Sequence, residues 1–378
     1  AISRRKRFLL TGDFWEMTTV PPSPIRCAID AFARGEIVVV TDDNDRENEG
    51  DLILAAVHVT PEKMAFIIRH TCGIVCAPLT GETARRLNLA PMVADGDAIH
   101  GTAFTVSVDY RHGTTTGISA DDRTATIRAL ANGNAGRTDF VRPGHIFPLI
   151  AREGGVLMRS GHTEAAVDLC RLAGVEPVAA ICELVNDDGT VMRGPEVAAF
   201  AEAHGIARIS VADLIAYRQA REKLVTRVAE FTVTSEIGEL AGYAYLTPFD
   251  KVHHYAFVYG NLGDGTGVPA RLHRATVIGD VFGGAKPVHE ALARFHEAGR
   301  GALVYLRDGA SGVPATAIEG TNSERERSAQ WREVGLGAQI LRDLRISSIR
   351  LLATRSRTYV GLAGFGIEIV ATEPIESD

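Results

Sequence analysis

The chain has 378 residues, of which 46% are hydrophobic and 23% are charged. This composition is ordinary for folded domains, and the length is enough for two cores, because domains commonly hold about 100–200 residues. A formal net charge of -7 argues against a nucleic-acid-binding protein, which would present a basic surface. No uninterrupted apolar stretch approaches the roughly 18 residues that span a bilayer. We therefore expect neither nucleic acid nor a membrane among its partners.

The first 20 residues are expected to form a flexible basic arm. Residues 3–8 superficially resemble a twin-arginine export signal, but Thr-Gly-Asp at 11–13 interrupts the apolar segment that such a signal needs. An odd number of cysteines at irregular spacing does not fit a disulfide framework. All five lie in the first half of the chain, at Cys27, Cys72, Cys76, Cys170 and Cys182. A reducing compartment, the cytoplasm, fits this pattern.

The first half of the chain shows alternating helix and strand signals. The expected helices cover 25–34, 61–69, a segment capped by Ser119, 163–173 and 211–217, and the expected strands cover 37–41, 52–57, 104–109 and 206–210. A charged connector is expected over 218–228. The pattern then predicts a hairpin of strands 255–259 and 269–273, a helix over 288–298, a strand over 302–306, a long helix over 324–344, and strands over 350–353 and 367–371.

These elements predict an α/β protein with mixed (α+β) sheets and two domains, each a mixed β-sheet packed with helices. The expected boundaries are 1–20 for the arm, 21–220 for the first domain and 221–378 for the second. The glycine-rich loop 260–267 resembles a nucleotide-binding fingerprint, but it joins two expected strands and opens no helix. A hairpin turn is the better interpretation of this loop.

A strongly acidic turn follows the first strand. Residues 42–51 (DDNDRENEGD) hold six carboxylates and one arginine, and such a turn is costly unless water or a cation neutralises it. An EF-hand beginning at Asp45 is rejected, because its twelfth position is Ala56 where a bidentate glutamate is needed. A solvated hairpin tip and a Mg²⁺ site completed by substrate oxygens both remain open. Arg46 is a phosphate-type donor beside these carboxylates.

A second group of polar residues precedes the helix expected at 163–173. A helix N-terminus offers free N–H groups, so Gly161–Glu164 is a candidate phosphate cradle with Arg159 beside it. His162 is either a metal ligand or a structural cap.

Two further residues are candidates for proton transfer. His145 follows what the sequence indicates is a Pro-Gly turn at 143–144. Glu183 lies in an apolar strand, and burial there would raise its pKa and suit proton transfer near neutrality. A salt-bridged core glutamate is the alternative interpretation of Glu183.

Together these segments resemble 3,4-dihydroxy-2-butanone 4-phosphate synthase of riboflavin biosynthesis. The resemblance covers about residues 25–220 and rests on residues 42–51 (DDNDRENEGD), 113–120 (GTTTGISA), 142–149 (RPGHIFPL), 159–168 (RSGHTEAAVD) and 182–185 (CELV). It implies conversion of ribulose 5-phosphate to 3,4-dihydroxy-2-butanone 4-phosphate and formate, with Mg²⁺ or Mn²⁺, by a homodimer.

The resemblance also implies roles for particular residues. The metal ligands would be Glu47 and His162, and the catalytic residues would be His145 and Glu183. The substrate would be held by Arg46, Glu47, Asp51, Arg159, Ser160, Gly161, His162, Thr163 and Glu183.

The second half resembles GTP cyclohydrolase II. The resemblance rests on 271–273 (RLH), 279–283 (GDVFG), 305–307 (YLR), 335–341 (GLGAQIL) and 361–370 (GLAGFGIEIV). That family binds Zn²⁺ through three cysteines, whose positions fall here on Thr276, Pro287 and His289, and its catalytic aspartate falls on Gln330. Proline has no ligand atom, so no zinc is expected in this domain.

Three hypotheses remain. The first is a synthase with a degenerate cyclohydrolase domain. The second is a bifunctional enzyme whose second half uses another ligand set, such as His273 and His289. The third is a non-catalytic scaffold for enzymes of the same pathway. The absence of cysteine beyond Cys182 favours the first hypothesis over the second, and the acidic turn with His145, His162 and Glu183 favours it over the third.

Overall fold

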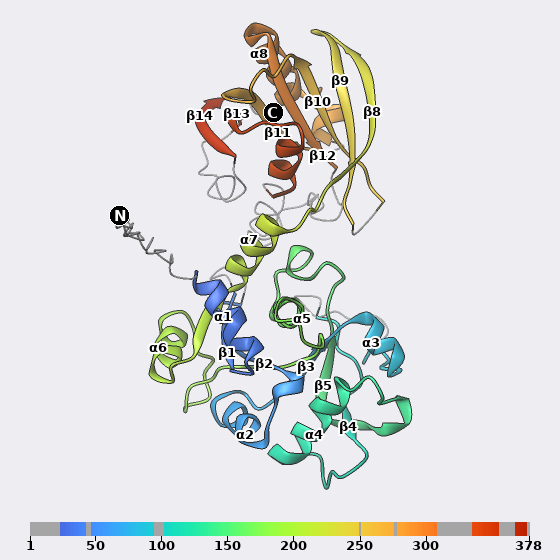
Figure 1. Cartoon of the computed structure of the whole chain (residues 1–378), viewed down its shortest axis with the longest axis vertical. Helices are drawn as coiled ribbons and strands as arrows, with labels where there is room; N and C mark the ends of the chain where they lie inside the picture. The colour runs from blue at the N-terminus through green and yellow to red at the C-terminus, as the bar shows by residue number, and fades with distance from the viewer. Residues whose placement is uncertain are drawn as a thin grey trace, which may run out of the picture.

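The computed structural model describes residues 23–42, 47–93, 102–248, 251–275, 278–307, 335–354 and 367–375. Within these residues the chain forms two seven-stranded sheets, each packed with helices, in two separate bodies joined by helix α7 (Val211–Arg221) (Figure 1). This confirms the expected fold class of two domains, each a mixed sheet with helices. The expected arm at 1–20 lies outside the described residues.

The first sheet has the strand order β4-β5-β3-β6-β2-β1-β7. Its strands are β1 (Val38–Thr41), β2 (Gly50–Ala55), β3 (Cys76–Leu79), β4 (Val108–Tyr110), β5 (Phe140–Ile150), β6 (Ala179–Glu183) and β7 (Ala207–Ser210). The pairs β1–β7 and β3–β5 are parallel and the other neighbours are antiparallel. The sheet is therefore mixed.

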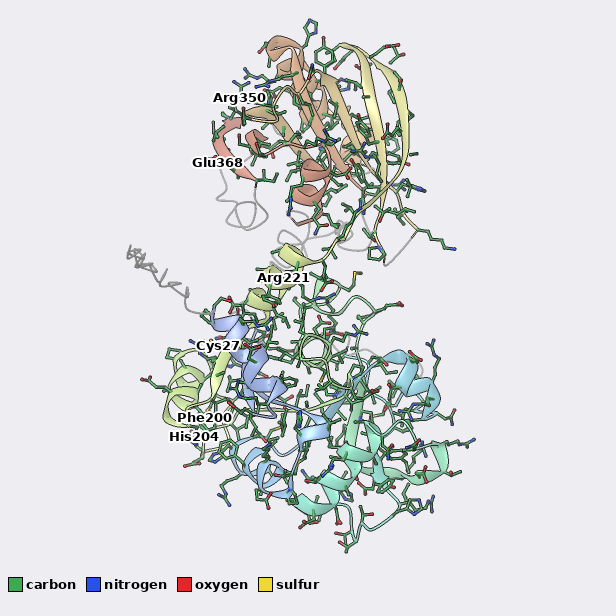
Figure 2. The ribbon with its side chains drawn as sticks, viewed as in Figure 1. Cys27, Phe200, His204, Arg221, Arg350 and Glu368 are labelled. Atoms are coloured by element: carbon green, nitrogen blue, oxygen red, sulfur yellow. The ribbon has the colours of Figure 1, made fainter. Side chains whose placement is uncertain are left out.

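Helices cover both faces of this sheet. They are α1 (Pro24–Ala33), α2 (Pro61–His70), α3 (Gly81–Arg86), α4 (Ala120–Leu130), α5 (His162–Leu172) and α6 (Pro195–Ala203). Successive strand residues point to opposite faces, so Val38 and Val40 join the core beneath α1, α5 and α7, whereas Val39 joins the core beneath α2, α4 and α6. Phe200 of α6 stacks on His204, the residue that follows the helix, with ring centroids 4.3 Å apart (Figure 2).

Several local signals are confirmed. Helix α1 ends before Gly35, which adopts the positive φ of 85° that favours glycine. The Ser119 side chain accepts a hydrogen bond from the backbone N–H of Asp122 and caps α4. Pro61 occupies the first turn of α2, where its missing N–H costs nothing.

Three local expectations are wrong. The segment before His145 is assigned to β5 and not to a separate Pro-Gly turn, and the pairing of β5 with β4 shifts register here, from Val108 with Ile146 to Asp109 with Val141. A Cβ at Gly144 would lie 2.2 Å from the backbone nitrogen of Asp109, so the glycine serves a close strand approach and not a turn. Strand β4 covers only Val108–Tyr110, whereas the expected strand covers 104–109. Residues 218–221 continue α7, because Arg218 is buried and paired with Asp168.

The second sheet has the strand order β14-β13-β11-β12-β10-β9-β8. Its elements are β8 (Thr226–Ser235), β9 (Gly238–Leu246), β10 (His254–Gly260), β11 (Val268–Arg274), α8 (Lys286–Ala298), β12 (Arg300–Leu306), β13 (Ser348–Ala353) and β14 (Glu368–Pro374), with a helix over the described residues 335–343. The expected hairpin around 260–267 is wrong, because β12 lies between β10 and β11, antiparallel to the first and parallel to the second. Residues 324–334 of the expected long helix lie outside the described residues.

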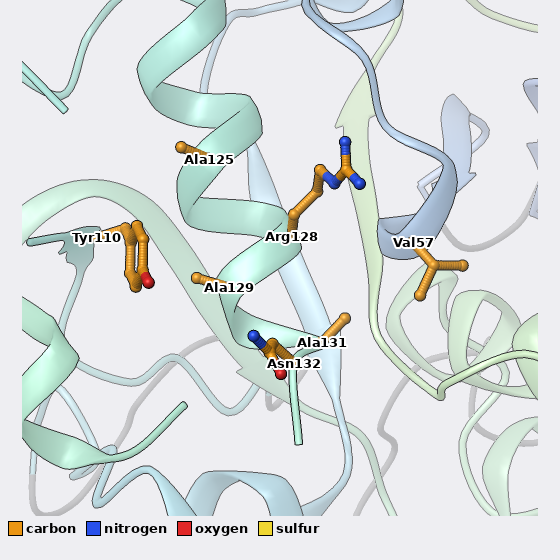
Figure 3. Close-up of a pocket in the computed structure, with 7 residues that line it drawn as sticks. All are labelled: Val57, Tyr110, Ala125, Arg128, Ala129, Ala131 and Asn132. Carbon is orange, nitrogen blue, oxygen red and sulfur yellow. The ribbon is translucent and has the colours of Figure 1, made fainter. Parts of the chain in front are cut away.

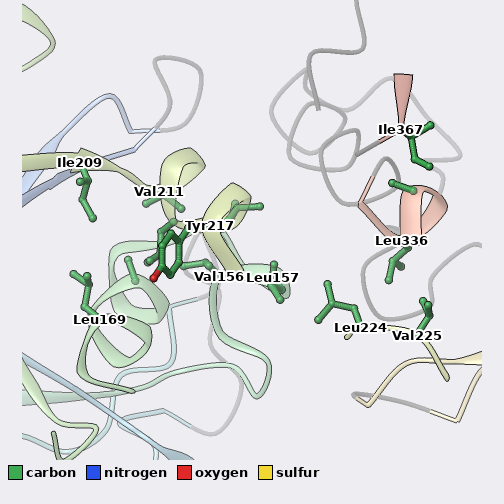
Figure 4. Packing of buried hydrophobic residues seen from close by; sticks show 14 of the residues in the cluster. Val156, Leu157, Leu169, Ile209, Val211, Tyr217, Leu224, Val225, Leu336 and Ile367 are labelled. Carbon is green, nitrogen blue, oxygen red and sulfur yellow. The ribbon is translucent and has the colours of Figure 1, made fainter. Parts of the chain in front are cut away.

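The two domains meet at the end of α7. Tyr217 packs with Val156 and Leu157 of the first domain, and Leu224 and Val225 face Leu336 of the second (Figure 4). The Gln339 side chain accepts the backbone N–H of Leu224 at 2.6 Å and donates to the carbonyls of Gln219 and Glu222 at 3.1 and 2.7 Å. Arg221, at the last turn of α7, lies between the two bodies (Figure 2).

No helix within the described ranges is both long and apolar enough to cross a membrane.

Candidate active site

The register of the first sheet brings three distant acidic and basic residues into one row. Phe147 on β5, Cys76 on β3, Ile181 on β6 and Ile53 on β2 are paired across the sheet. A step of two residues from this row along each strand, toward the same end of the sheet, leads to three polar residues: His145 on β5, Glu183 on β6 and Asp51 on β2. Asp51 pairs directly with Glu183. Since alternate residues share a face, all three point to the side on which α5 packs.

The acidic turn between β1 and β2 is organised by Asp42. One oxygen of its buried carboxylate accepts the backbone N–H of Glu47 and the other accepts that of Glu49, both at 2.9 Å. These hydrogen bonds fix the backbone at Glu47 and Glu49, just before β2 begins. Residues 43–46, and with them Arg46, lie outside the described residues.

The first residue of α5, His162, meets this turn. Its Nδ1 lies 3.8 Å from Glu47 Oε2 and 3.6 Å from Asp51 Oδ1, too far for hydrogen bonds. Ligand atoms of Asp42, Glu47 and His162 all lie within 4.8 Å of one another. Atoms that bind one octahedral Mg²⁺ at about 2.1 Å lie about 3–4 Å apart, so this donor set of two carboxylates and one imidazole fits a hard divalent cation.

The Asp51 carboxyl gives independent support for a cation. Its side chain is buried, and Oδ1 has no hydrogen-bond partner among the described residues. Burial, opposed by His162 and reinforced by the neighbouring carboxylates Glu183, Glu47 and Asp42, raises the pKa of Asp51 to about 8. A positive charge at this position would relieve that repulsion.

His145 is oriented by a residue that the sequence did not single out. Its Nδ1 lies 2.7 Å from Asp109 Oδ2, and its backbone N–H donates to Asp109 Oδ1 at 2.8 Å. The His145 side chain remains 43% exposed, so its ring is accessible to a bound molecule. A carboxylate on one ring nitrogen fixes the tautomer and leaves the other nitrogen for chemistry.

The segment 113–120 packs against this pair. Gly117 has a φ of 86°, and a Cβ there would lie 2.0 Å from Asp109 Oδ2 and 2.6 Å from His145 Nδ1. Asp122 holds the segment by accepting from the backbone N–H groups of Thr115 and Gly117 at 2.9 and 3.0 Å. The glycine is therefore required both by its conformation and by the space beside His145.

Glu183 is half-buried, which corrects the expectation of a fully buried carboxyl. Its Oε2 accepts from the Cys72 thiol at 2.9 Å, and its backbone carbonyl accepts the Cys72 N–H at 3.0 Å. Partial exposure leaves this carboxylate able to reach a bound molecule.

The loop before α5 is compact. Arg159 donates to Glu164 Oε2 at 2.6 Å and to Thr102 Oγ1 at 2.8 Å. A Cβ at Gly161 would lie 2.4 Å from the Arg159 guanidinium, and Ser160 and Thr163 are buried. The helix N-terminus expected to bind phosphate is thus formed, with Arg159 fixed beside it.

The structure brings Glu47, Asp51 and His162 together, and places His145 and Glu183 in the same row of the sheet as Asp51. Sequence reasoning missed Asp109, which lies 36 residues from His145 and carries no local signal. Asp42 lies in the acidic turn, but no local signal distinguishes it from the other carboxylates there as a metal ligand.

A separate pocket with a volume of about 420 Å³ lies beside α4 (Figure 3). Val57, Tyr110, Arg128 and Asn132 contribute to its lining together with alanines of α4. None of the residues discussed above lines it, so the candidate site is the polar row and not this hollow.

In the second domain, the candidate zinc-site residues have other partners. His273 Nε2 lies 2.8 Å from Asp280, and Tyr305 donates to the same carboxylate at 2.6 Å. His289 Nδ1 lies 2.8 Å from Glu236 at the surface. Pro287 is in the first turn of α8, while Thr276 and Gln330 lie outside the described residues.

Comparison with known proteins agrees with this architecture. The family described as 3,4-dihydroxy-2-butanone 4-phosphate synthase matches residues 26–217, and the family described as GTP cyclohydrolase II matches residues 226–374. The chain therefore belongs to the 3,4-dihydroxy-2-butanone 4-phosphate synthase family, and it carries a second domain of the GTP cyclohydrolase II family.

The relatives include riboflavin biosynthesis proteins. The chain is 45% identical to the riboflavin biosynthesis protein RibBA of Nocardia farcinica, over 93% of this chain and 90% of that protein. It is 42% identical to the bifunctional riboflavin biosynthesis protein RIBA 1, chloroplastic, of Arabidopsis thaliana, over 98% of this chain and 72% of that protein. These names do not support the prediction that the second domain has lost GTP cyclohydrolase II activity.

Solved structures extend the comparison. RibBX of A. baumannii, described as a two-domain 3,4-dihydroxy-2-butanone 4-phosphate synthase, is 36% identical with a TM-score of 0.77 and covers 92% of this chain and 100% of its own. A 3,4-dihydroxy-2-butanone 4-phosphate synthase in complex with two magnesium ions is 48% identical with a TM-score of 0.51, over 53% of this chain and 98% of its own.

Proposed function

We propose that the first domain converts D-ribulose 5-phosphate to 3,4-dihydroxy-2-butanone 4-phosphate and formate in riboflavin biosynthesis. The observation that carries this proposal is the row of His145, Glu183 and Asp51 on one face of the sheet, with His162 and Glu47 beside Asp51. Family membership of residues 26–217 supports the same reaction.

Glu47 and His162 are the proposed metal ligands, and Asp42 offers a further oxygen. When bound, Mg²⁺ or Mn²⁺ would polarise the substrate carbonyl and acidify the adjacent C–H bond. The solved relative with two magnesium ions supports this choice of metal.

His145 and Glu183 are the proposed acid and base. His145 is held by Asp109 through Nδ1 and is partly exposed, so it can take or give a proton at its other ring nitrogen. Glu183, at the end of β6, can hold the proton of a substrate hydroxyl. The substrate is held by Arg46, Asp51, Arg159, Ser160, Gly161 and Thr163, with the phosphate at the start of α5.

The test of this function is an assay of the purified full chain with ribulose 5-phosphate and Mg²⁺, following formate and the four-carbon phosphate product. Equal amounts of both products are expected. A chain that binds Mg²⁺ and remains folded but releases neither product would refute the proposal in favour of the non-catalytic scaffold.

For the second domain we propose a cyclohydrolase fold without zinc-dependent hydrolysis of GTP. Opening a guanine ring needs a metal-activated water, and Pro287 has no ligand atom while His289 is engaged with Glu236. The bifunctional enzyme is the second candidate, favoured by the names of the curated relatives and by the family match over 226–374.

The two candidates differ in one measurement. The full chain, supplied with GTP and with Mg²⁺ or Zn²⁺, is expected to release no formate. GTP-dependent formate release that disappears in the His289→Ala variant would establish the bifunctional enzyme instead. The expected homodimer rests on the family resemblance, and sedimentation analysis tests it.

A further inference from the structure

Two thiols and a carboxylate form a compact cluster beside the proposed active site. Cys72, in the turn after α2, has its Sγ 3.5 Å from Cys182 Sγ on β6 and 2.9 Å from Glu183 Oε2. One ligand atom from each of the three residues lies within 4.8 Å of the others. The cluster differs from the group of Asp42, Glu47 and His162 in that it contains sulfur.

The spacing of the cluster fits a tetrahedral metal ion. Two thiolates bound to one Zn²⁺ at about 2.3 Å lie about 3.8 Å apart, and a carboxylate oxygen lies about 3.6 Å from each sulfur. The two sulfur atoms already stand 3.5 Å apart, and Glu183 is half-buried at the end of its strand. Binding would therefore need small side-chain movements and no change in the sheet.

We propose that Cys72, Cys182 and Glu183 bind a thiophilic divalent cation such as Zn²⁺, and that this binding inhibits the synthase. Two thiols lose their protons to solvent as one Zn²⁺ binds, and water completes the coordination. Cys72 is exposed and offers a route for the ion to the buried Cys182.

Ligand type separates this site from the proposed Mg²⁺ site. Soft thiolates favour Zn²⁺, whereas Mg²⁺ prefers oxygen ligands and keeps several waters. The sulfur cluster should therefore stay free of Mg²⁺ at concentrations that support catalysis, and its occupation by Zn²⁺ should persist when Mg²⁺ is in excess.

The inhibitory half of this proposal rests on the proposed function, because it depends on Glu183 acting in proton transfer. A Glu183 oxygen bound to Zn²⁺ cannot accept a proton. Cation binding itself depends only on the geometry of the cluster, so the two halves can be tested separately.

Binding is measured with Co²⁺ as a spectroscopic probe of the reduced full chain in the presence of excess Mg²⁺. Thiolate-to-cobalt charge-transfer absorption in the near ultraviolet is expected for the wild type, with displacement by Zn²⁺. The matched control is Cys27→Ser, which removes an exposed thiol on α1 outside the cluster (Figure 2) and should leave the absorption unchanged. Cys72→Ser should weaken Zn²⁺ binding by about tenfold or more.

Inhibition is measured as the ratio of formate release with and without Zn²⁺, within each variant. The ratio should fall in the wild type and in Cys27→Ser, and Cys72→Ser should need about tenfold more Zn²⁺ for the same fall. Absorption or inhibition that is equal in Cys72→Ser and wild type would overturn the site. Cobalt absorption without any inhibition would overturn the inhibitory half and count against the role of Glu183, while the binding site would stand.

Discussion

Asp109 binds His145 twice, through the imidazole at 2.7 Å and through the backbone N–H at 2.8 Å. The two residues lie on adjacent strands, β4 and β5, with Gly117 packed against their contact. The carboxylate therefore sets both the position of the His145 backbone and the tautomer of its ring, and we infer that Asp109 is a positioning residue for the proton-transfer step.

Asp109→Asn should lower kcat by about 10²-fold with little change in KM, because the amide cannot hold the same imidazole tautomer. Adding this change to His145→Ala should cause little further loss, since Asp109 acts through His145. The control is Asp139→Asn, which alters a similar contact of 3.0 Å to the exposed His112 and should leave kcat unchanged. Additive losses in the double variant would contradict the positioning role.

His145→Ala and Glu183→Gln should each reduce kcat by about 10²-fold or more, the usual contribution of one acid or base group. Both side chains are partly exposed, so the folded state should survive both changes. Formate release measures the fall in kcat, and circular dichroism tests whether each variant remains folded. Near wild-type turnover in either variant would show that its proton-transfer role is wrongly assigned.

Removal of divalent metal with EDTA should abolish formate release, and Mg²⁺ or Mn²⁺ should restore it. The described protein ligands are few, so the ion should exchange readily. Glu47→Gln should raise the Mg²⁺ concentration for half-maximal activity by about tenfold or more. Glu36→Gln removes the same charge from an exposed pair with Arg34 and should have no effect. Full turnover after exhaustive chelation would exclude the metal role.

The buried pair of Asp168 and Arg218 should give stability a specific pH dependence. Burial raises the pKa of Asp168 to about 6, although Arg218 at 2.7 Å opposes the shift. The folded state therefore binds this proton more tightly than the unfolded state, so the contribution to stability is complete below pH about 4 and is lost as the pH rises through 6, by at most about 3 kcal/mol.

Calorimetry of the wild type and Asp168→Asn across this range measures that contribution. The Tm of the wild type should fall relative to that of the variant as the pH rises from about 4 to 7. The opposite trend would show that attraction to Arg218 outweighs the cost of burial.

A chain shortened after Arg221 should retain synthase turnover. All residues of the proposed site lie before this point, and a solved 3,4-dihydroxy-2-butanone 4-phosphate synthase matches only 53% of this chain over 98% of its own length. The Gln339→Ala variant of the full chain removes three hydrogen bonds to the segment 219–224 and tests whether contact with the second domain affects turnover. A folded fragment without any turnover would mean that the second domain is needed for catalysis.

The amino-acid sequence was enough to predict several local elements and the kinds of chemistry that the side chains can perform. The cap at Ser119, the end of α1 before Gly35 and the β-branched run of β1 depend on contacts within one turn or one strand, so short windows of sequence predicted them. The acidic turn and the segment with His162 indicated a metal and a phosphate in the same way.

Which of these residues come together depends on how the strands are ordered and paired in the folded protein. Glu183 joins Asp51 because β6 pairs with β2, Asp109 reaches His145 across β4 and β5, and Cys72 meets Cys182 from 110 residues away. The expected hairpin at 260–267 failed for the same reason, since β12 is inserted between its strands from later in the chain. Strand order and register depend on the free energy of packing the whole sheet, and no local window of residues contains that information.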